Sequence, residues 1–266
     1  MTNTRAVTFT KVPEVTLLFW IIKILATTLG ETGGDAVTMS MLQADKNAHN
    51  GGYLIGTGMF LAVFIAAVIA QIAMKKFHPL IYWTTIVATT TLGTTMADFV
   101  DRSLGIGYAG GSSLLLAGLL ASLAAWRLSE GSISVNTVAT PRVEIFYWVA
   151  ILFSQTLGTA LGDWMADTNG LGYQGGAVIF AGALAIVATL YFYTTISRTL
   201  LFWVAFILTR PLGATLGDLL DKPLNHGGLD ISRYAASAVI AAIMVAFILL
   251  LPQRPGVHPG AHEQRA

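Results

Sequence analysis

The sequence of 266 residues contains no cysteine, which excludes disulfide bonds, thiolate metal sites and a cysteine nucleophile. It is also poor in charge: Asp, Glu, Lys and Arg make up 11% of the residues, whereas soluble domains usually have about 25%. Fifteen basic and fourteen acidic side chains nearly cancel, so no net charge would attract a nucleic acid. The chain is 55% hydrophobic, and this composition predicts a protein of the lipid bilayer.

Eight apolar segments are long enough, or nearly long enough, to cross a hydrocarbon core as helices, which takes about 20 residues each. The segments are continuously apolar, and this pattern favours helices over the alternating strands of a membrane β-barrel. We therefore predict an all-α integral membrane protein with about eight transmembrane helices. The segments are 12–30, 53–73, 80–97, 110–126, 143–162, 175–193, 199–217 and 232–251.

The charges between these segments predict the orientation. Lys75, Lys76, Arg127, Arg142 and Arg198 fall on one side of the membrane, whereas the other side carries mixed acidic and basic residues. Because basic loops are retained in the cytoplasm, both termini are expected there. The expected organisation is an N-terminal cytoplasmic segment 1–11, a single transmembrane domain 12–252 and a disordered cytoplasmic tail 253–266.

A fourfold repeat runs through this domain. The segments FWIIKILATTLGETGGD, YWTTIVATTTLGTTMAD, YWVAILFSQTLGTALGD and FWVAFILTRPLGATLGD share an aromatic–Trp pair, a Leu-Gly step and an Asp at fixed spacings. Each copy is expected to be a two-helix hairpin that starts inside, at about 12–75, 76–138, 139–196 and 197–252. Parallel repeats can be related by an axis along the membrane normal, and we predict a pseudo-fourfold bundle. The shared positions are Trp20/Trp83/Trp148/Trp203, Gly30/Gly93/Gly158/Gly213 and Asp35/Asp98/Asp163/Asp218.

One face of each odd-numbered helix is expected to be polar, because residues four apart lie on one helix face. Polar groups at membrane depth are costly unless they face one another, water or a substrate. The stripes therefore predict a transport path, or alternatively hydrogen bonds that only hold helices together. The Leu-Gly glycines are expected to permit close helix packing. The stripes read Thr27–Glu31–Asp35, Thr90–Thr94–Asp98, Gln155–Thr159–Asp163 and Arg210–Ala214–Asp218, and Lys23 extends the first one.

The repeated aspartates give the candidate metal site. Asp35, Asp98, Asp163 and Asp218 are expected near the external helix ends, with Glu31 one turn deeper. Rings of acidic side chains attract cations into a pore, and four carboxylates near one axis would repel one another without a bound cation. Oxygen ligands, without cysteine or a histidine inside the spans, suit Mg²⁺, Ca²⁺ or Mn²⁺ better than Zn²⁺ or Cu⁺.

A structural interpretation of the external charges remains open. Asp101 with Arg102, and Asp221 with Lys222, would neutralise each other locally. The repeated aspartates would then be solvated helix ends without a ligand.

Three residues break the repeat symmetry: Lys23, Glu31 and Arg210. Repeats one and four are neighbours in a ring of four, so an Arg210–Glu31 ion pair is expected. It would be a structural contact or a gate that opens when a cation competes for Glu31. Pro211 removes a backbone hydrogen bond beside Arg210 and can supply a hinge.

The opening KVPEVTLLFWIIKILATTLGETGGD and the four Trp–Leu-Gly–Asp repeats, over about residues 11–251, resemble a family of bacterial multi-spanning proteins labelled uncharacterised membrane-anchored proteins. The resemblance implies a multi-pass protein of the bacterial inner (plasma) membrane. The fragment from Glu31 to Asp35 is also similar to the Glu-x-Gly-Asp-Lys motif of manganese/calcium cation exchangers. Here the two acids are four residues apart instead of three, no Lys follows, and the other repeats lack the Glu.

The sequence thus predicts a membrane transporter for a small hard cation, with a divalent ion such as Mn²⁺ as substrate. It predicts no cofactor, no nucleic-acid partner and no obligate protein partner. Two other classes stay open: a carrier for a small organic or anionic substrate anchored by Arg210 and Lys23, and a membrane sensor or regulator without transport. An enzyme is not expected, because no Ser/His pairing lies within the spans and no His-Glu metalloprotease pattern is present.

Overall fold

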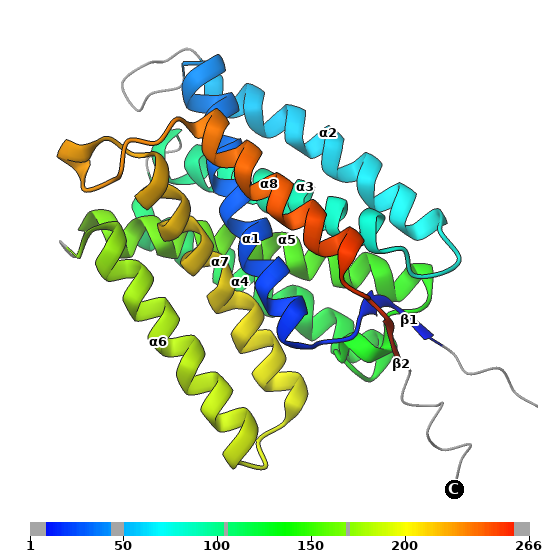
Figure 1. Cartoon of the computed structure of the whole chain (residues 1–266). Coiled ribbons are helices and arrows are strands. Elements are labelled where there is room, and N and C mark those ends of the chain that lie inside the picture. Colours follow the sequence, from blue (N-terminus) through cyan, green and yellow to red (C-terminus); the bar gives the residue numbers. More distant parts are fainter. Residues whose placement is uncertain (1–8, 44–50, 104–105, 169–170, 258–266) are drawn as a thin grey trace, which may run out of the picture.

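The computed structural model describes residues 9–43, 51–103, 106–168 and 171–257. Within these ranges the chain forms eight α-helices and one two-stranded antiparallel sheet (Figure 1). The strands are β1 (Phe9–Pro13) and β2 (Pro255–Val257). The helices are α1 (Leu17–Asp35), α2 (Gly52–Ala73), α3 (Pro79–Asp98), α4 (Gly107–Glu130), α5 (Pro141–Asp163), α6 (Gly172–Tyr193), α7 (Arg198–Asp221) and α8 (Arg233–Leu250).

Three of the four odd-numbered helices begin after a residue whose side chain satisfies a free backbone donor. Thr16, Thr140 and Ser197 each accept a hydrogen bond from a backbone N–H in the first turn of α1, α5 and α7, which is the usual role of such caps. Pro79 and Pro141 stand in the first turn of α3 and α5, where the missing N–H breaks no helical bond. The aromatic–Trp pair then follows in each helix.

The first predicted segment differs most from the structure. Helix α1 starts at Leu17 and ends at Asp35, instead of spanning 12–30. The prediction was wrong at both ends because β1 continues to Pro13 and Thr16 caps the helix. At the other end, Gly33 and Gly34 do not stop the helix.

The four odd-numbered helices form a closed ring. Helix α1 packs against α3, α3 against α5, α5 against α7, and α7 against α1. The even-numbered helices lie outside this ring, and Figure 1 shows α2 and α6 on opposite flanks of the bundle. The ring places the polar stripes of the repeats in the interior of the protein.

The expected hairpins implied that the two helices of one repeat pack mainly on each other. In the structure they do not. Helix α2 packs on α3, α4 on α5 and α6 on α7, while α8 closes the circle by packing on α1. Each even-numbered helix thus covers the odd-numbered helix of the following repeat. The four repeats interlock, so an isolated repeat would lack the partner of its outer helix.

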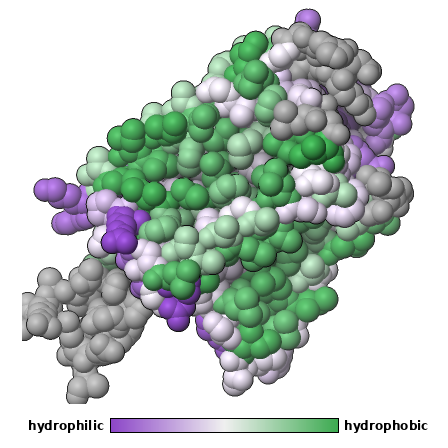
Figure 2. All heavy atoms as spheres, turned by 180° about the vertical axis from the view of Figure 1, so that it is seen from behind, coloured by the Kyte–Doolittle hydropathy of each residue, from purple (hydrophilic) through white to green (hydrophobic). Residues whose placement is uncertain are grey.

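The outer surface is apolar. Within the described residues, seven helices are long and apolar enough to cross a membrane by length and composition. Helix α3 is not among them, because its threonines lower its mean hydropathy. Figure 2 shows a broad hydrophobic face, with hydrophilic residues gathered towards the ends of the molecule. These features are compatible with a multi-pass membrane protein.

The end of the bundle that carries the termini is covered by ordered chain. Strand β2 pairs with β1, and the Trp83 indole donates to the Gln253 side chain at 2.7 Å. Lys11 on β1 lies 2.6 Å from Glu144 on α5, and both side chains are buried. The expectation of disorder from residue 253 was therefore wrong for 253–257, because these residues hydrogen-bond β1 and α3. Residues 1–8 of the expected N-terminal segment and 258–266 of the expected tail lie outside the described residues.

The aromatic pairs of the repeats pack together just beneath this cover. The Tyr82 and Tyr147 hydroxyls lie 2.6 Å apart, and both residues are fully buried. These aromatic side chains fill the space between the four odd-numbered helices at the terminal end. The ring centroids are 5.4 Å apart for Phe19 and Trp83, 5.8 Å for Tyr82 and Trp148, and 5.7 Å for Trp20 and Phe202. Trp126 of α4 joins them, 6.0 Å from Trp203.

Candidate functional site

The Leu-Gly glycines form notches that receive the polar stripe of the next repeat. A Cβ at Gly30 would meet the Thr90 side chain, and a Cβ at Gly213 would meet Thr27. The same relation holds around the ring for Gly93 against Gln155 and for Gly158 against Arg210. The first layer of the stripes therefore lies at the contacts between neighbouring odd-numbered helices, which agrees with the packing role expected for these glycines.

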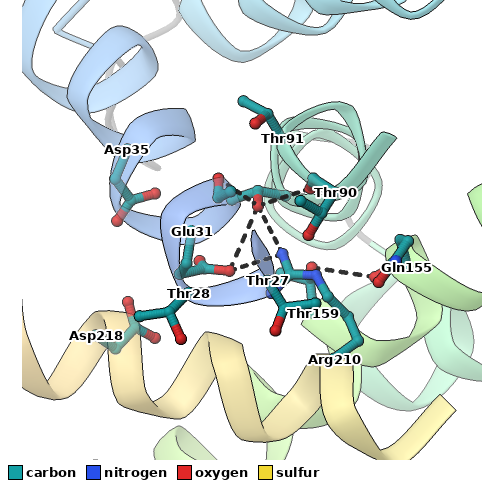
Figure 3. Close-up of polar contacts among 12 residues, drawn as sticks. Thr27, Thr28, Glu31, Asp35, Thr90, Thr91, Gln155, Thr159, Arg210 and Asp218 are labelled. Atoms are coloured by element: carbon teal, nitrogen blue, oxygen red, sulfur yellow. Dashed lines mark hydrogen bonds and ion pairs between the residues drawn. The ribbon is translucent and has the colours of Figure 1, made fainter. Parts of the chain in front are cut away.

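The expected ion pair between repeats one and four is formed. Arg210 Nη2 on α7 lies 2.8 Å from Glu31 Oε2 on α1, and both side chains are almost entirely buried. The same nitrogen donates to Thr94 Oγ1 on α3 at 2.6 Å. Figure 3 shows the Arg210 guanidinium extending from α7 towards Glu31. Three helices thus meet at one charged group in the interior of the ring.

A second ionic cluster lies one turn further from the termini. Lys222 Nζ lies 2.5 Å from Asp35 Oδ2 and 3.0 Å from Asp218 Oδ1. Asp35 and Asp218 come from α1 and α7 and lie beside Glu31 in Figure 3. One carboxylate oxygen from each of Glu31, Asp35 and Asp218 lies within 4.8 Å of the others. All three residues are buried.

This spacing has a chemical consequence. Oxygen ligands of Ca²⁺ or Mg²⁺ stand about 2.0–2.6 Å from the ion, so two ligands of one ion are up to about twice that distance apart. The three carboxylates are therefore close enough to share one hard cation. We name Glu31, Asp35 and Asp218 the carboxylate triad.

The two other repeat aspartates do not belong to this triad. Asp98 and Asp163 are buried at the ends of α3 and α5, and each has interactions of its own. The structure thus brings together the aspartates of repeats one and four, with Glu31, instead of four at one point.

The odd-numbered helices change geometry directly after the repeat aspartate. Helices α1, α3 and α5 pass into π-helical segments at Ala36–Met41, Phe99–Ser103 and Trp164–Thr168. Such segments are rare and are often found at functional sites. Helix α7 instead remains α-helical to Asp221, and this regular turn puts Lys222 one turn after Asp218. The regular end of the fourth repeat's helix therefore supplies a base to the triad.

The deeper path residues are buried but differ in their partners. Thr27 Oγ1 lies 2.8 Å from the Ile24 carbonyl and 3.2 Å from that of Thr209, and Thr159 Oγ1 donates to the Gln155 carbonyl at 3.3 Å. These two threonines make the hydrogen bonds within and between helices that a structural role requires. Thr90 Oγ1 and both amide atoms of Gln155 have no hydrogen-bond partner among the described residues.

Lys23 is fully buried, one turn deeper than Thr27. Its ammonium lies 4.1 Å from the centre of the Phe206 ring and has no hydrogen-bond partner within the described part of the chain. A cation over an aromatic face is stabilised by the electrons of the ring. The Lys23 ammonium thus contacts an aromatic ring, whereas the nearby Arg210 guanidinium forms an ion pair with Glu31.

Lys222 is the site residue that sequence reasoning missed. The closest ion-pair partner of Asp221 is Arg233 at 3.2 Å, while the Lys222 ammonium lies between Asp35 and Asp218, so the local pairing of Lys222 with Asp221 is not the main contact of either residue. Adjacent residues on a helix do not face each other, whereas residues four apart do. The spacing of Asp218 and Lys222 carried the signal that was overlooked. The side chain of Arg102, the proposed partner of Asp101, lies outside the described residues.

One family model matches the chain four times, at residues 18–77, 81–132, 146–197 and 201–252. Each match holds an odd-numbered helix and the even-numbered helix that follows it. No curated protein and no solved structure matches the chain, so the similarity of the Glu31–Asp35 fragment to cation exchangers finds no support. Because the four matches cover most of the sequence, the chain belongs to the family described as Repeat of Unknown Function (DUF347).

Proposed function

We propose that this protein is a membrane transporter for a small hard cation, with a divalent ion such as Mn²⁺ as its substrate. The observation that carries the proposal is the carboxylate triad, buried between α1 and α7 with oxygens within 4.8 Å of one another. Buried carboxylates that face one another are costly unless cations neutralise them. A transported cation is the ligand that best explains why three of them converge.

The ligand atoms define the class of metal. The triad offers only oxygen, which suits Mg²⁺, Ca²⁺ and Mn²⁺. The chain has no cysteine, and His78 and His226, the described histidines, lie outside the eight helices. Soft metals that prefer sulfur or imidazole ligands therefore fit this site poorly.

The surroundings of the triad are also suited to transport across a membrane. The apolar outer surface fits a multi-pass position in the bacterial inner membrane, with both termini in the cytoplasm. The buried stripe residues Thr90, Thr94 and Gln155 continue from the triad towards the terminal end. At that end the aromatic side chains close the ring, so passage would require their rearrangement. The structure would then represent a state of the transporter in which the path is closed on the cytoplasmic side.

A flux measurement tests the proposal. Purified protein in proteoliposomes is supplied with Mn²⁺, Ca²⁺, Mg²⁺, Zn²⁺ or Co²⁺, and a pH dye reports coupled proton movement. We expect saturable flux of a hard divalent ion, lowered about tenfold or more in Asp35→Asn/Asp218→Asn, because two of three ligands are neutralised. Asp230→Asn is the matched control, since Asp230 is exposed in the α7–α8 connection and Asn tolerates its positive φ.

Two results would count against cation transport. One is the absence of flux for every ion with folded protein in the vesicles, which would favour a sensor or regulator. The other is equal flux in the wild type and the Asp35→Asn/Asp218→Asn variant, which would make the triad a structural feature.

A second candidate function rests on a different observation. Arg210 Nε and Nη1, and Lys23 Nζ, are buried donors without a hydrogen-bond partner among the described residues. Such donors suit a small anion or carboxylate, and this supports the carrier for an organic or anionic substrate. Chloride and acetate uptake in the same vesicles distinguishes the two candidates. Anion flux that is lost in Lys23→Met, together with no Mn²⁺ flux in the wild type, would favour the second.

A further inference from the structure

The carboxylate triad already holds a positive charge from the chain itself. The Lys222 ammonium lies 2.5 Å from Asp35 Oδ2 and 3.0 Å from Asp218 Oδ1, which is between two carboxylates where a bound metal ion would stand. We propose that Lys222 is a tethered cation that occupies the site in the metal-free protein and withdraws when a divalent cation binds. This inference rests on the proposed cation transport and adds to it the residue that competes with the substrate.

The charges of the cluster favour a divalent ion as the competitor. Three carboxylates meet two bases, Arg210 and Lys222, so one negative charge stays unmatched when Lys222 is in place. Withdrawal of Lys222 leaves two unmatched negative charges, which one divalent ion neutralises. A monovalent ion would leave one negative charge unmatched, as Lys222 already does, and so would gain nothing in charge balance by displacing it.

A buried oxygen of Asp35 shows that the ammonium fills the site incompletely. Asp35 is fully buried, and its Oδ1 has no hydrogen-bond partner in the described part of the chain. Of the two carboxylate oxygens of Asp35, only Oδ2 accepts a hydrogen bond from Lys222. A metal ion can take oxygens from several carboxylates at once, whereas the ammonium has three donors on one carbon stem. The unused oxygen is thus a ligand position that the tethered cation leaves free.

The two bases of the cluster differ in their freedom to leave. Arg210 is fully buried inside α7, and its stem packs in the notch at Gly158. Lys222 instead follows the last residue of α7, and its side chain is 12% exposed. Its backbone is fixed by bonds to Asp218 and Asp230, while the flexible stem carries the ammonium. Lys222 can therefore turn outwards without moving the ring helices.

Exchange of the two cations has a consequence for transport. When no metal is bound, the Lys222 ammonium lowers the unmatched charge of the site. The metal-free protein can then change conformation with the site in an apolar surrounding. Without Lys222, the empty site would carry two unmatched charges, and its rearrangement would be slow. Loss of Lys222 should therefore strengthen metal binding and weaken flux.

The test compares Mn²⁺ binding and Mn²⁺ flux for the wild type and Lys222→Met. Titration calorimetry of detergent-purified protein at fixed salt gives the dissociation constant, and proteoliposomes give the flux. We expect Lys222→Met to bind Mn²⁺ about tenfold or more tightly, because the competent, unoccupied fraction of the site rises, and to transport it more slowly. Lys222→Arg keeps the charge and should bind no more tightly than the wild type.

Two methionine variants serve as matched controls. Lys75→Met removes an exposed lysine at the opposite end of the bundle and should change neither quantity. Arg233→Met removes a nearby base that pairs with Asp221 and reports the general effect of lost positive charge. Equal tightening by Arg233→Met and Lys222→Met would overturn the inference, because occupancy of the site would then not be the cause.

The remaining outcomes separate this inference from the proposed function. Mn²⁺ binding that needs Asp35 and Asp218 but is unchanged or weaker in folded Lys222→Met would leave cation transport intact and reject the tethered cation. Binding by Lys222→Met with none in the wild type would support it. No binding by either folded protein would reject both proposals together.

Discussion

The pairing of Arg210 with Glu31 is the strongest constraint at the scale of single residues. Both side chains are removed from solvent, and the pair is also bonded to Thr94. A buried ion pair adds little net stability over apolar side chains, but loss of one partner leaves a buried charge without compensation. The two residues should therefore depend on each other more than either contributes alone.

A double-mutant cycle measures this dependence. We expect Arg210→Met to lower the free energy of unfolding by about 3–5 kcal/mol, because Glu31 is left unpaired. Arg210→Met/Glu31→Gln should recover much of the loss, because the charge is removed while the stem beside Gly158 keeps its volume. Equilibrium unfolding in mixed detergent micelles gives the values. Additive effects of the two substitutions would show that the pair is not coupled.

At the scale of the helices, the repeated glycines determine how closely the ring closes. Each Leu-Gly glycine receives a side chain of the neighbouring odd-numbered helix, in a cyclic order that returns from α7 to α1. Small residues at such contacts let helix backbones approach closely in a membrane. A single methyl group at a notch should therefore disturb one interface of the ring.

Gly213→Ala tests this packing at the α7–α1 contact. The added methyl group would overlap the Thr27 side chain and lie against the Thr27 backbone, and overpacking of this kind costs about 1–3 kcal/mol. Gly182→Ala is the matched control, because a Cβ there meets nothing within 4 Å and Ala favours the helix. Loss of unfolding free energy and of the monodisperse peak in size-exclusion chromatography is expected for Gly213→Ala alone. Equal behaviour of the two variants would contradict the notch.

The sequence predicts the helices well because each signal is local. Apolar runs predict their number and order, and the four copies of the Trp–Leu-Gly–Asp pattern predict which positions are equivalent. The covering of each odd-numbered helix by the preceding repeat was not predictable in this way. Apolar faces of outer helices look alike in sequence, so periodicity alone does not show which neighbour they cover.

The candidate site was predictable in part for a similar reason. The Glu31–Arg210 pair was predictable because repeats one and four are neighbours in a ring of four. The aspartates were recognisable as candidates because each occupies the same position in its repeat. Asp35 and Asp218 meet Glu31 because α1 and α7 pack against each other, and Glu31 has no counterpart in the other repeats. Helix α7 stays regular to Asp221, which puts Lys222 one turn after Asp218, whereas the other three helices pass into π segments. Such a difference in helix type has no reliable sequence signal.

At the scale of the whole molecule, the two ends of the bundle differ in kind. The terminal end is closed by aromatic rings and covered by the β1–β2 sheet, whereas the opposite end holds the carboxylate triad and its bases. Basic residues of the α2–α3 connection lie at the terminal end, and cytoplasmic loops are the ones enriched in Lys and Arg. In the proposed function, the orientation in the membrane therefore decides from which side a cation would reach the triad.

The absence of cysteine makes this orientation directly measurable, because a single introduced thiol gives an unambiguous label. Lys75 lies exposed between α2 and α3, and Asn225 lies exposed between α7 and α8. We expect a membrane-impermeant maleimide to label Asn225→Cys in intact cells and to label Lys75→Cys only after lysis, since the basic loop stays inside. The reverse result would put the triad on the cytoplasmic side and exchange the direction of access. Labelling of both sites from outside would contradict a bundle whose odd-numbered helices all cross in the same direction.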